Sequence, residues 1–234
     1  MAGPRGLIIA IDGVVGAGKT SAARGLAAAL GYRHVDTGAM YRALALAAMR
    51  RRVEPEDTGG LVQLLAAARI ELEPESEGGA ILLDGDDVSE EIRRPEVARR
   101  VGAYADKPQV RRALVERQRA MGAEGGVVVD GRDVGTVIFP GADLKVRMTA
   151  DEEERARRRH LELTAKGVSS SFEEVRSDLR RRDAEDRQRD YAVASCPDAT
   201  GRTGDADLIE FDTTGLGLDQ VIGQLVAWAR ARGA

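Results

Sequence analysis

Short apolar runs without polar alternation recur along the chain, and each predicts a strand that is buried on both faces. Stretches with the helical spacing of apolar residues separate these runs. The first two are Lys19–Leu30, which Gly31 ends, and Ala39–Arg52. Strand and helix alternate in this way in parallel βαβ units, so the pattern predicts an α/β fold with about five parallel strands flanked by helices. The five runs are Leu7–Ile11, Arg33–Asp36, Val127–Val129, Leu144–Met148 and Leu208–Phe211.

Residues 58–92 depart from this alternation. A helical stretch, Leu61–Ala68, precedes two short strand-like runs, Ile70–Glu73 and Ala80–Leu83, with glycines at 78 and 79 between them. We interpret the segment as a small insertion that has a sheet of its own. Helical patterns resume after it at Val97–Tyr104, Val110–Met121, Asp151–Thr164, Phe172–Arg189 and Asp219–Arg232.

The composition narrows the class of protein. The 234 residues are 43% hydrophobic, which is enough for one large core or for one core with an appended subdomain. A net charge of −4 gives no general attraction to nucleic acid or to anionic membranes. A single cysteine, Cys196, excludes an internal disulfide, and the two histidines, His34 and His160, lie on different predicted elements. We expect no signal peptide and no membrane span, and therefore a cytoplasmic protein.

The first strand leads directly into a phosphate-binding loop. Residues Gly13–Thr20 read Gly-Val-Val-Gly-Ala-Gly-Lys-Thr and match G-x-x-x-x-G-K-[ST] at every fixed position, between a buried strand and a helix. In such a loop, backbone N–H groups and the positive end of the helix dipole face phosphate oxygens. Lys19 would reach the β- and γ-phosphates, and the hydroxyl of Thr20 would reach Mg²⁺. The loop predicts that the chain handles a nucleoside triphosphate.

The loop alone does not name the reaction, because it serves GTPases, motors, transporters and small-molecule kinases. The sequence has no Asn-Lys-x-Asp motif for reading guanine and no long coupling domain. Many arginines follow residue 130. These features favour a kinase with a closing lid.

Two further strand ends carry polar residues. Asp36–Arg42, which reads Asp-Thr-Gly-Ala-Met-Tyr-Arg, opens a helix, and Thr37 is expected to cap that helix. Asp130–Thr136 follows three valines, and Asp130 is placed as a carboxylate that would hold Mg²⁺ through water. The carboxyl ends of parallel strands face the active crevice of such sheets. Both segments are therefore expected at the site.

In combination these motifs resemble the bacterial cytidylate (CMP/dCMP) kinases, a family of nucleoside monophosphate kinases, along nearly the whole chain. Single pieces are unspecific, but the ordered set is highly specific. The matching pieces are Gly13–Thr20, Asp36–Arg42, Leu83–Arg93, Pro108–Arg111, Gln118-Arg119, Asp130–Pro140, Glu153–Arg159, Arg182-Asp183, Asp186–Arg189 and Asp212–Thr214.

The resemblance implies a fold of the P-loop NTPase type with a lid and an enlarged insertion that binds the nucleoside monophosphate (NMP). It places the core at residues 1–57, 105–150 and 190–234, the NMP-binding insertion at about 58–104, and the lid with its flanking helices at about 151–189. It also implies a monomeric, Mg²⁺-dependent enzyme that transfers the γ-phosphate of ATP to CMP or dCMP, with these small molecules as its partners.

The resemblance also assigns roles to single residues. Asp133 and Arg111 would read the cytosine, and a carboxylate suits the N4 amino group of cytosine but would repel the oxygen of uracil at the same place. Residues that would contact the acceptor are Thr37, Tyr41, Arg42, Arg111, Arg132, Asp133, Arg182, Asp186 and Arg189. Those that would contact ATP are Gly13, Gly16, Ala17, Gly18, Lys19, Thr20, Ser21, Arg155 and Arg158. Those expected to be catalytic are Lys19, Arg132, Arg158 and Arg189, and Thr20 and Asp130 would serve the metal.

The chain departs from the family pattern at three places. Val14-Val15 stands where Pro-Ser is frequent, Gly102 falls where a serine near the base is common, and residues 195–204 are irregular. Two alternatives stay open: a kinase for another small acceptor, such as UMP, AMP or shikimate, and a nucleotide-binding module without turnover.

Overall fold

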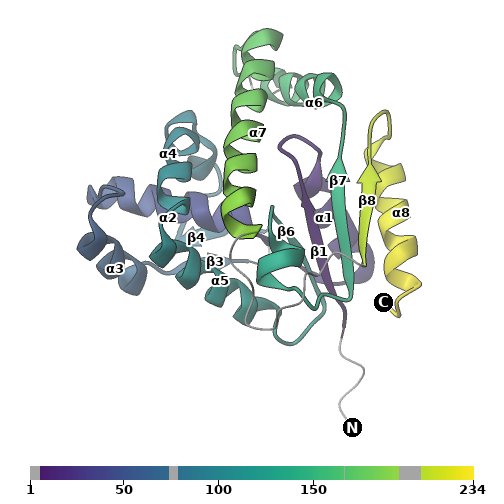
Figure 1. The fold of residues 1–234 in the computed structure, drawn as a ribbon, viewed down its shortest axis with the longest axis horizontal. Helices are drawn as coiled ribbons and strands as arrows, with labels where there is room; N and C mark the ends of the chain where they lie inside the picture. The colour runs from purple at the N-terminus through teal and green to yellow at the C-terminus, as the bar shows by residue number, and fades with distance from the viewer. Residues whose placement is uncertain (1–5, 74–78, 166, 195–206) are drawn as a thin grey trace.

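The computed structural model describes residues 6–73, 79–165, 167–194 and 207–234, with the backbone alone for 188–194. A five-stranded parallel sheet forms its centre, in the order β2-β6-β1-β7-β8 (Figure 1). The predicted parallel sheet is confirmed, and each strand lies within two residues of its predicted bounds. The strands are β1 (Ile8–Gly13), β2 (Arg33–Asp36), β6 (Val127–Asp130), β7 (Leu144–Thr149) and β8 (Leu208–Asp212).

Helices cover both faces of the sheet because successive side chains of a strand point to opposite sides. In β1, Ile9 and Ile11 pack with α1 and α8, whereas Ile8 and Ala10 belong to the core on the other face, with α2 and α5. Figure 1 shows α8 at one edge of the molecule and the group of α2 to α5 at the other. The helices are α1 (Lys19–Leu30), α2 (Thr37–Arg51), α5 (Pro108–Gly122) and α8 (Leu218–Arg230).

The insertion predicted after residue 58 contains its own three-stranded sheet, as expected. The strands of this small sheet are antiparallel, and its apolar side chains join the same core as α2. The elements of this segment are α3 (Thr58–Ala67), β3 (Ile70–Leu72), β4 (Ile81–Leu83), β5 (Asp86–Asp87), the 3-10 turn η2 (Glu91–Arg93) and α4 (Pro95–Ala105).

The two charged helices predicted after residue 150 are α6 (Glu152–Ala165) and α7 (Phe172–Ala194). In Figure 1, α6 lies above the carboxyl end of the sheet, and α7 runs downward from the level of α6 to the level of β6. A separate small core holds them to the phosphate loop. In this core Val15 packs with Ala156, Val175 and Leu179. The valine that departs from the family pattern thus joins the loop to the lid helices.

The sequence analysis missed the short elements β5 and η2 of the insertion, and it also missed an element near the predicted site. Residues Val134–Ile138 form a single π-helical turn, η3, directly after Asp133. Five residues are too few to show a helical period, so the pattern carried no signal for it. No helix in the described part of the chain is both long and apolar enough to cross a membrane.

Candidate functional site

The phosphate loop joins β1 to α1 and depends on glycine at both ends. Gly13 has φ +149°, and a Cβ atom there would lie 2.0 Å from the carbonyl oxygen of Met148. Gly18, the N-cap of α1, has φ +84°, which is in the left-handed region that glycine tolerates. Only glycine therefore permits this path of the chain. Of the other residues expected at ATP, Gly16 and Ala17 lie within the loop, and Ser21 lies in the first turn of α1.

Lys19 is the first residue of α1 and is held over the loop. Its Nζ donates to the carbonyl oxygen of Val14 at 2.8 Å. Burial and, secondly, the positive charge of Arg132 lower its pKa to about 8, although the carboxylates of Asp130, Asp12 and Asp186 act in the opposite direction. Charged side chains of β1, of the end of β6 and of α7 therefore surround the ammonium group of Lys19.

Asp130, at the end of β6, connects three elements. Its Oδ2 accepts from the hydroxyl of Thr20 at 2.7 Å, and its Oδ1 lies 2.7 Å from Nε2 of His34 on β2. Its carbonyl oxygen accepts from the hydroxyl of Thr37 at 2.8 Å. Because Asp130 is only 3% exposed, these bonds fix its carboxylate beside the Thr20 hydroxyl.

Thr37 does not cap its helix as the sequence suggested. The N-cap of α2 is Asp36, whose Oδ1 accepts from the N–H of Ala39 at 2.8 Å. An aspartate directly before the helix supplies the acceptor, so the Thr37 hydroxyl is left to bond Asp130. Asp36 also pairs with Arg42 at 3.0 Å. Although burial raises the pKa of Asp36, the guanidinium of Arg42 and the Ala39 N–H keep it below its ordinary value.

Arg111 and Asp133 come together as an ion pair between α5 and the end of β6. Tyr41 lies near both residues: burial and, secondly, the charge of Asp133 raise its pKa to about 12, although the charge of Arg111 opposes this rise. Tyr41, which is expected at the acceptor, thus forms one cluster with the two residues that are expected to read its base.

Arg132 pairs with Asp186 of α7, which brings that helix against the segment that follows β6. Burial and the nearby Arg132 lower the pKa of Arg182, one turn earlier in α7. Arg182 and Asp186, both expected at the acceptor, therefore lie close to Arg132. Arg189 lies on the same helix, but its side chain is outside the described residues.

Arg155, expected at the triphosphate, is only 6% exposed and is already fully engaged. Its Nη1 donates to the carbonyl oxygen of Val15 and pairs with Asp183 of α7, both at 2.9 Å. Its Nε donates to the carbonyl oxygen of Ala150 at 3.1 Å. In this arrangement Arg155 ties the phosphate loop to α6 and α7, and its contact with ATP stays a prediction.

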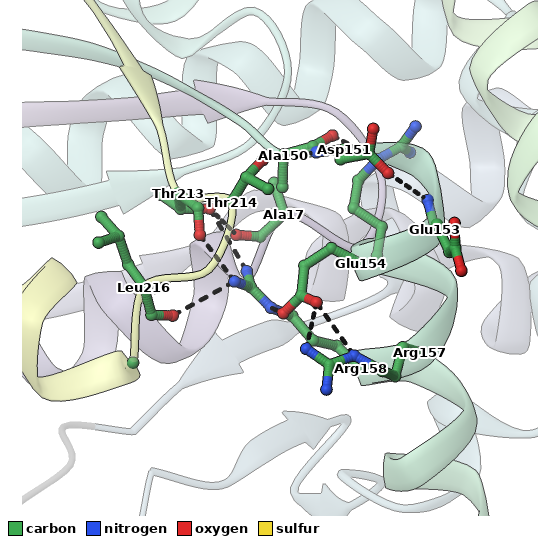
Figure 2. A network of polar contacts seen from close by, with 12 residues as sticks. Ala17, Ala150, Asp151, Glu153, Glu154, Arg157, Arg158, Thr213, Thr214 and Leu216 are labelled. Carbon is green, nitrogen blue, oxygen red and sulfur yellow. Dashed lines mark hydrogen bonds and ion pairs between the residues drawn. The ribbon is translucent and has the colours of Figure 1, made fainter.

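Arg158 points toward the loop after β8 (Figure 2). Its Nη2 donates to the carbonyl oxygens of Thr213 at 2.7 Å and Leu216 at 3.3 Å, and its Nε donates to Glu154 at 2.8 Å. Thr213, in turn, is fully buried, and its hydroxyl lies 3.5 Å from the carbonyl oxygen of Ala17. Thr213 therefore contacts both Arg158 and the phosphate loop, and it connects the two. The expected catalytic role of Arg158 stays a prediction.

Sequence reasoning missed two buried groups of the site. His34, which was given no role, contacts Asp130, and this hydrogen bond raises the pKa of His34 against the opposing effect of burial. Asp12 accepts two backbone N–H groups of η3, at 2.7 and 2.8 Å. A lone polar residue after an apolar strand was the only available signal for Asp12. Of the family departures, Gly102 lies in α4, and residues 195–204 are outside the described range.

The comparisons with known proteins agree with this geometry. The cytidylate kinase family model matches residues 9–231. The chain is 41% identical to the cytidylate kinase of Geobacter sulfurreducens over 99% of its own length and 96% of that protein. It is 44% identical to the cytidylate kinase of Carboxydothermus hydrogenoformans, with 93% of this chain and 95% of that protein covered.

A solved structure shares the fold alone. The crystal structure of an uncharacterized protein from Eubacterium ventriosum aligns with a TM-score of 0.52 at 12% identity, over 96% of this chain and 98% of that one. Family membership rests instead on the sequence matches, which extend over both the phosphate loop and the acceptor cluster. The chain belongs to the cytidylate kinase family.

Proposed function

We propose that the protein transfers the γ-phosphate of ATP to CMP or dCMP and releases ADP with CDP or dCDP. The observation that carries this proposal is the convergence of two sets of groups at the carboxyl ends of β1, β2 and β6. Lys19 and Thr20 belong to the phosphate loop, and the pair Arg111–Asp133 lies at the end of β6. A nucleotide sensor needs only the first set, whereas a kinase needs both.

The chemistry of the Arg111–Asp133 pair supports cytosine as the acceptor base. A carboxylate accepts a hydrogen bond from the N4 amino group of cytosine, whereas uracil would present lone pairs to it. The guanidinium of Arg111 orients the carboxylate of Asp133 through their ion pair. The pair therefore favours CMP over UMP, and shikimate offers it no base edge at all.

The acceptor phosphate is assigned to arginines near the loop. Arg132 and Arg42 carry positive charge at the ends of β6 and β2, and each is oriented by a carboxylate, Asp186 and Asp36 respectively. Phosphoryl transfer is accelerated mainly by positioning and by neutralising the charge on the phosphoryl group. Together with Lys19, these side chains would bring the two phosphates close without a covalent enzyme intermediate.

The residues present fit a Mg²⁺ ion that is held mainly by phosphate and water. Thr20 offers a hydroxyl oxygen, and Asp130 a buried carboxylate hydrogen-bonded to it at 2.7 Å. No group of three or more acidic, histidine or cysteine side chains that could hold a metal occurs among the described residues. Thr20 would hold such an ion directly and Asp130 would hold it through water, and the ion would supply positive charge that neutralises the substrate phosphates.

The proposal is tested by ADP release from Mg-ATP with CMP, dCMP, UMP, AMP and shikimate offered one at a time. CMP and dCMP are expected to give the highest kcat/KM. Lys19→Ala, which keeps the fold but removes the charge over the loop, is expected to lower the rate with CMP at least about 100-fold. Faster turnover of another acceptor would show that this acceptor, and not CMP, is the substrate. ADP release that no acceptor stimulates would contradict the proposed kinase activity.

A further inference from the structure

Asp12 lies at the end of β1, one residue before the phosphate loop begins, and is only 4% exposed. Its carboxylate extends to the segment that follows β6. Oδ1 accepts from the N–H of Val134 at 2.7 Å, and Oδ2 accepts from the N–H of Gly135 at 2.8 Å. Both oxygens of a buried carboxylate are thus used on two successive backbone groups of one turn.

These two N–H groups begin η3, and the first N–H groups of a helical turn lack partners within the turn. The residue directly before a helix usually supplies the missing acceptor. Asp133 occupies that position, but it makes no side-chain cap, and its carboxylate pairs with Arg111 instead. Asp12 therefore takes over the capping of η3, which leaves Asp133 available to the acceptor side of the site.

β1 holds the same segment at a second point. The carbonyl oxygen of Ile11 accepts from the N–H of Gly131 at 3.0 Å. Arg132 and Asp133 therefore lie between two anchors on β1, one at residue 131 and one at residues 134 and 135. A segment fixed at both ends in this way presents its two side chains in a set position before any ligand arrives.

Gly135 fits closely between two charged side chains at the second anchor. A Cβ atom at this position would lie 3.3 Å from Oδ2 of Asp12 and 3.4 Å from Cδ of Lys145. A side chain at 135 would therefore push η3 away from Asp12. A substitution at either Asp12 or Gly135 would therefore disturb the hydrogen bonds between Asp12 and η3.

We propose that Asp12 is a positioning residue for acceptor recognition: by capping η3 it sets the position of Asp133 and Arg132, and so joins the root of the phosphate loop to the part of the site that reads the acceptor. This inference rests on the proposed function. Asp12 is not expected to touch either substrate.

The primary test is Asp12→Asn, measured as KM for CMP, KM for ATP and the ratio of kcat/KM for CMP to that for UMP. An amide accepts on one side only, so one of the two N–H groups loses its acceptor and faces another donor. Loss of a hydrogen bond to a charged group changes an equilibrium about tenfold or more. We expect KM for CMP to rise by about that factor and the CMP preference to fall, with KM for ATP changed less than about twofold.

Two further variants keep the test informative. Asp143→Asn makes the same chemical change at the opposite end of β1, where Oδ2 of Asp143 accepts from the N–H of Ile8 at 2.7 Å, and it is expected to leave all three quantities unchanged. Gly135→Ala disturbs the contact without altering any charge, and should raise KM for CMP in the same direction as Asp12→Asn. If Asp12→Asn fails to fold, Gly135→Ala still tests the proposal.

The inference is overturned if Asp12→Asn or Gly135→Ala folds and retains the wild-type KM for CMP and the wild-type preference. It is also overturned if KM for ATP rises as much as KM for CMP, because Asp12 would then support the phosphate loop alone. Failure of the proposed function is a separate result, since it shows in the wild-type protein as a lack of preference for CMP.

Discussion

The buried ion pair between Arg155 and Asp183 gives a direct test of how the lid helices are fixed to the phosphate loop. The two side chains are 8% and 13% exposed, and the pair joins α6 to α7. Arg155 also donates to the carbonyl oxygen of Val15. The perturbation is Arg155→Met, which keeps much of the aliphatic stem and removes every one of these polar contacts.

The expected loss of stability follows from the burial of Asp183. Without Arg155, Oδ2 of Asp183 loses its partner at 2.9 Å, and Oδ1 already has no partner among the described residues. Removal of one member of a buried ion pair typically costs about 3–5 kcal/mol, because the other charge stays buried without compensation. For a chain of this length that loss lowers Tm by about 6–20 °C.

The assay is urea unfolding followed by far-ultraviolet circular dichroism on the nucleotide-free protein, for Arg155→Met, Asp183→Asn and the double variant. The double variant is expected to be at least as stable as Arg155→Met alone, because the asparagine leaves no unpaired charge. The resulting coupling energy should be at least about 1 kcal/mol.

Two results would refute this reasoning. Losses that simply add in the double variant would show that the pair is not coupled. A variant Arg155→Met that unfolds like the wild type, but whose KM for ATP rises sharply, would show that Arg155 acts on the triphosphate, as the family resemblance suggested.

Three other predictions concern pH and packing. Since burial and Arg132 lower the pKa of Lys19 to about 8, kcat/KM for ATP should fall about tenfold per pH unit above that value; Lys19→Arg, which stays charged, should lose this decline, and its persistence would contradict the assignment. Burial raises the pKa of Asp12 from 3.8 to about 6, so its contribution to stability is complete below pH 3.8 and is lost as the pH rises through 6. The wild type should therefore lose about 3 kcal/mol of stability between pH 4 and 7 that Asp12→Asn does not lose, and equal losses would refute this. At the contact of α1 with α8, a Cβ atom on Gly25 would lie 2.2 Å from Cδ1 of Ile222. Gly25→Ala should therefore lower the free energy of unfolding, measured in urea, by about 1–3 kcal/mol. Gly223→Ala should not lower it, because a Cβ atom at Gly223 would meet open space.

The sheet and the phosphate loop could be predicted because their signals are local. Each strand is a short apolar run, and Gly13–Thr20 carries its motif between a strand and a helix. The left-handed φ of Gly18 is a property of one residue that the motif itself requires. Local signals of this kind do not depend on partners far along the chain.

The cap of α2 and the turn η3 were not predicted, for two different reasons. Asp36 and Thr37 are both good capping residues, and only the fold decides which of them stands before the helix. The turn η3 is capped by Asp12, 122 residues earlier in the chain, so no local pattern marks it. Long-range hydrogen bonds of this kind leave no period in the sequence.

The arginines of α6 show that a sequence can predict where charged residues lie without predicting which groups they contact. The sequence places several arginines after residue 150, and the family resemblance assigns two of them, Arg155 and Arg158, to ATP. The structure gives Arg155 and Arg158 protein partners, which are carbonyl oxygens and the carboxylates of Asp183 and Glu154. Whether a guanidinium meets protein or ligand depends on packing between α6, α7 and the loops, which the sequence does not display.

Recognition of cytosine by Asp133, oriented by Arg111, is tested by the ratio of kcat/KM for CMP to that for UMP in the wild type and in Asp133→Asn. We expect a wild-type ratio of at least about 100, and a ratio at least about tenfold lower in the variant, because an amide can also donate to the oxygen of uracil. A wild-type protein that turns over UMP as well as CMP, or a variant that keeps the full ratio, would contradict it.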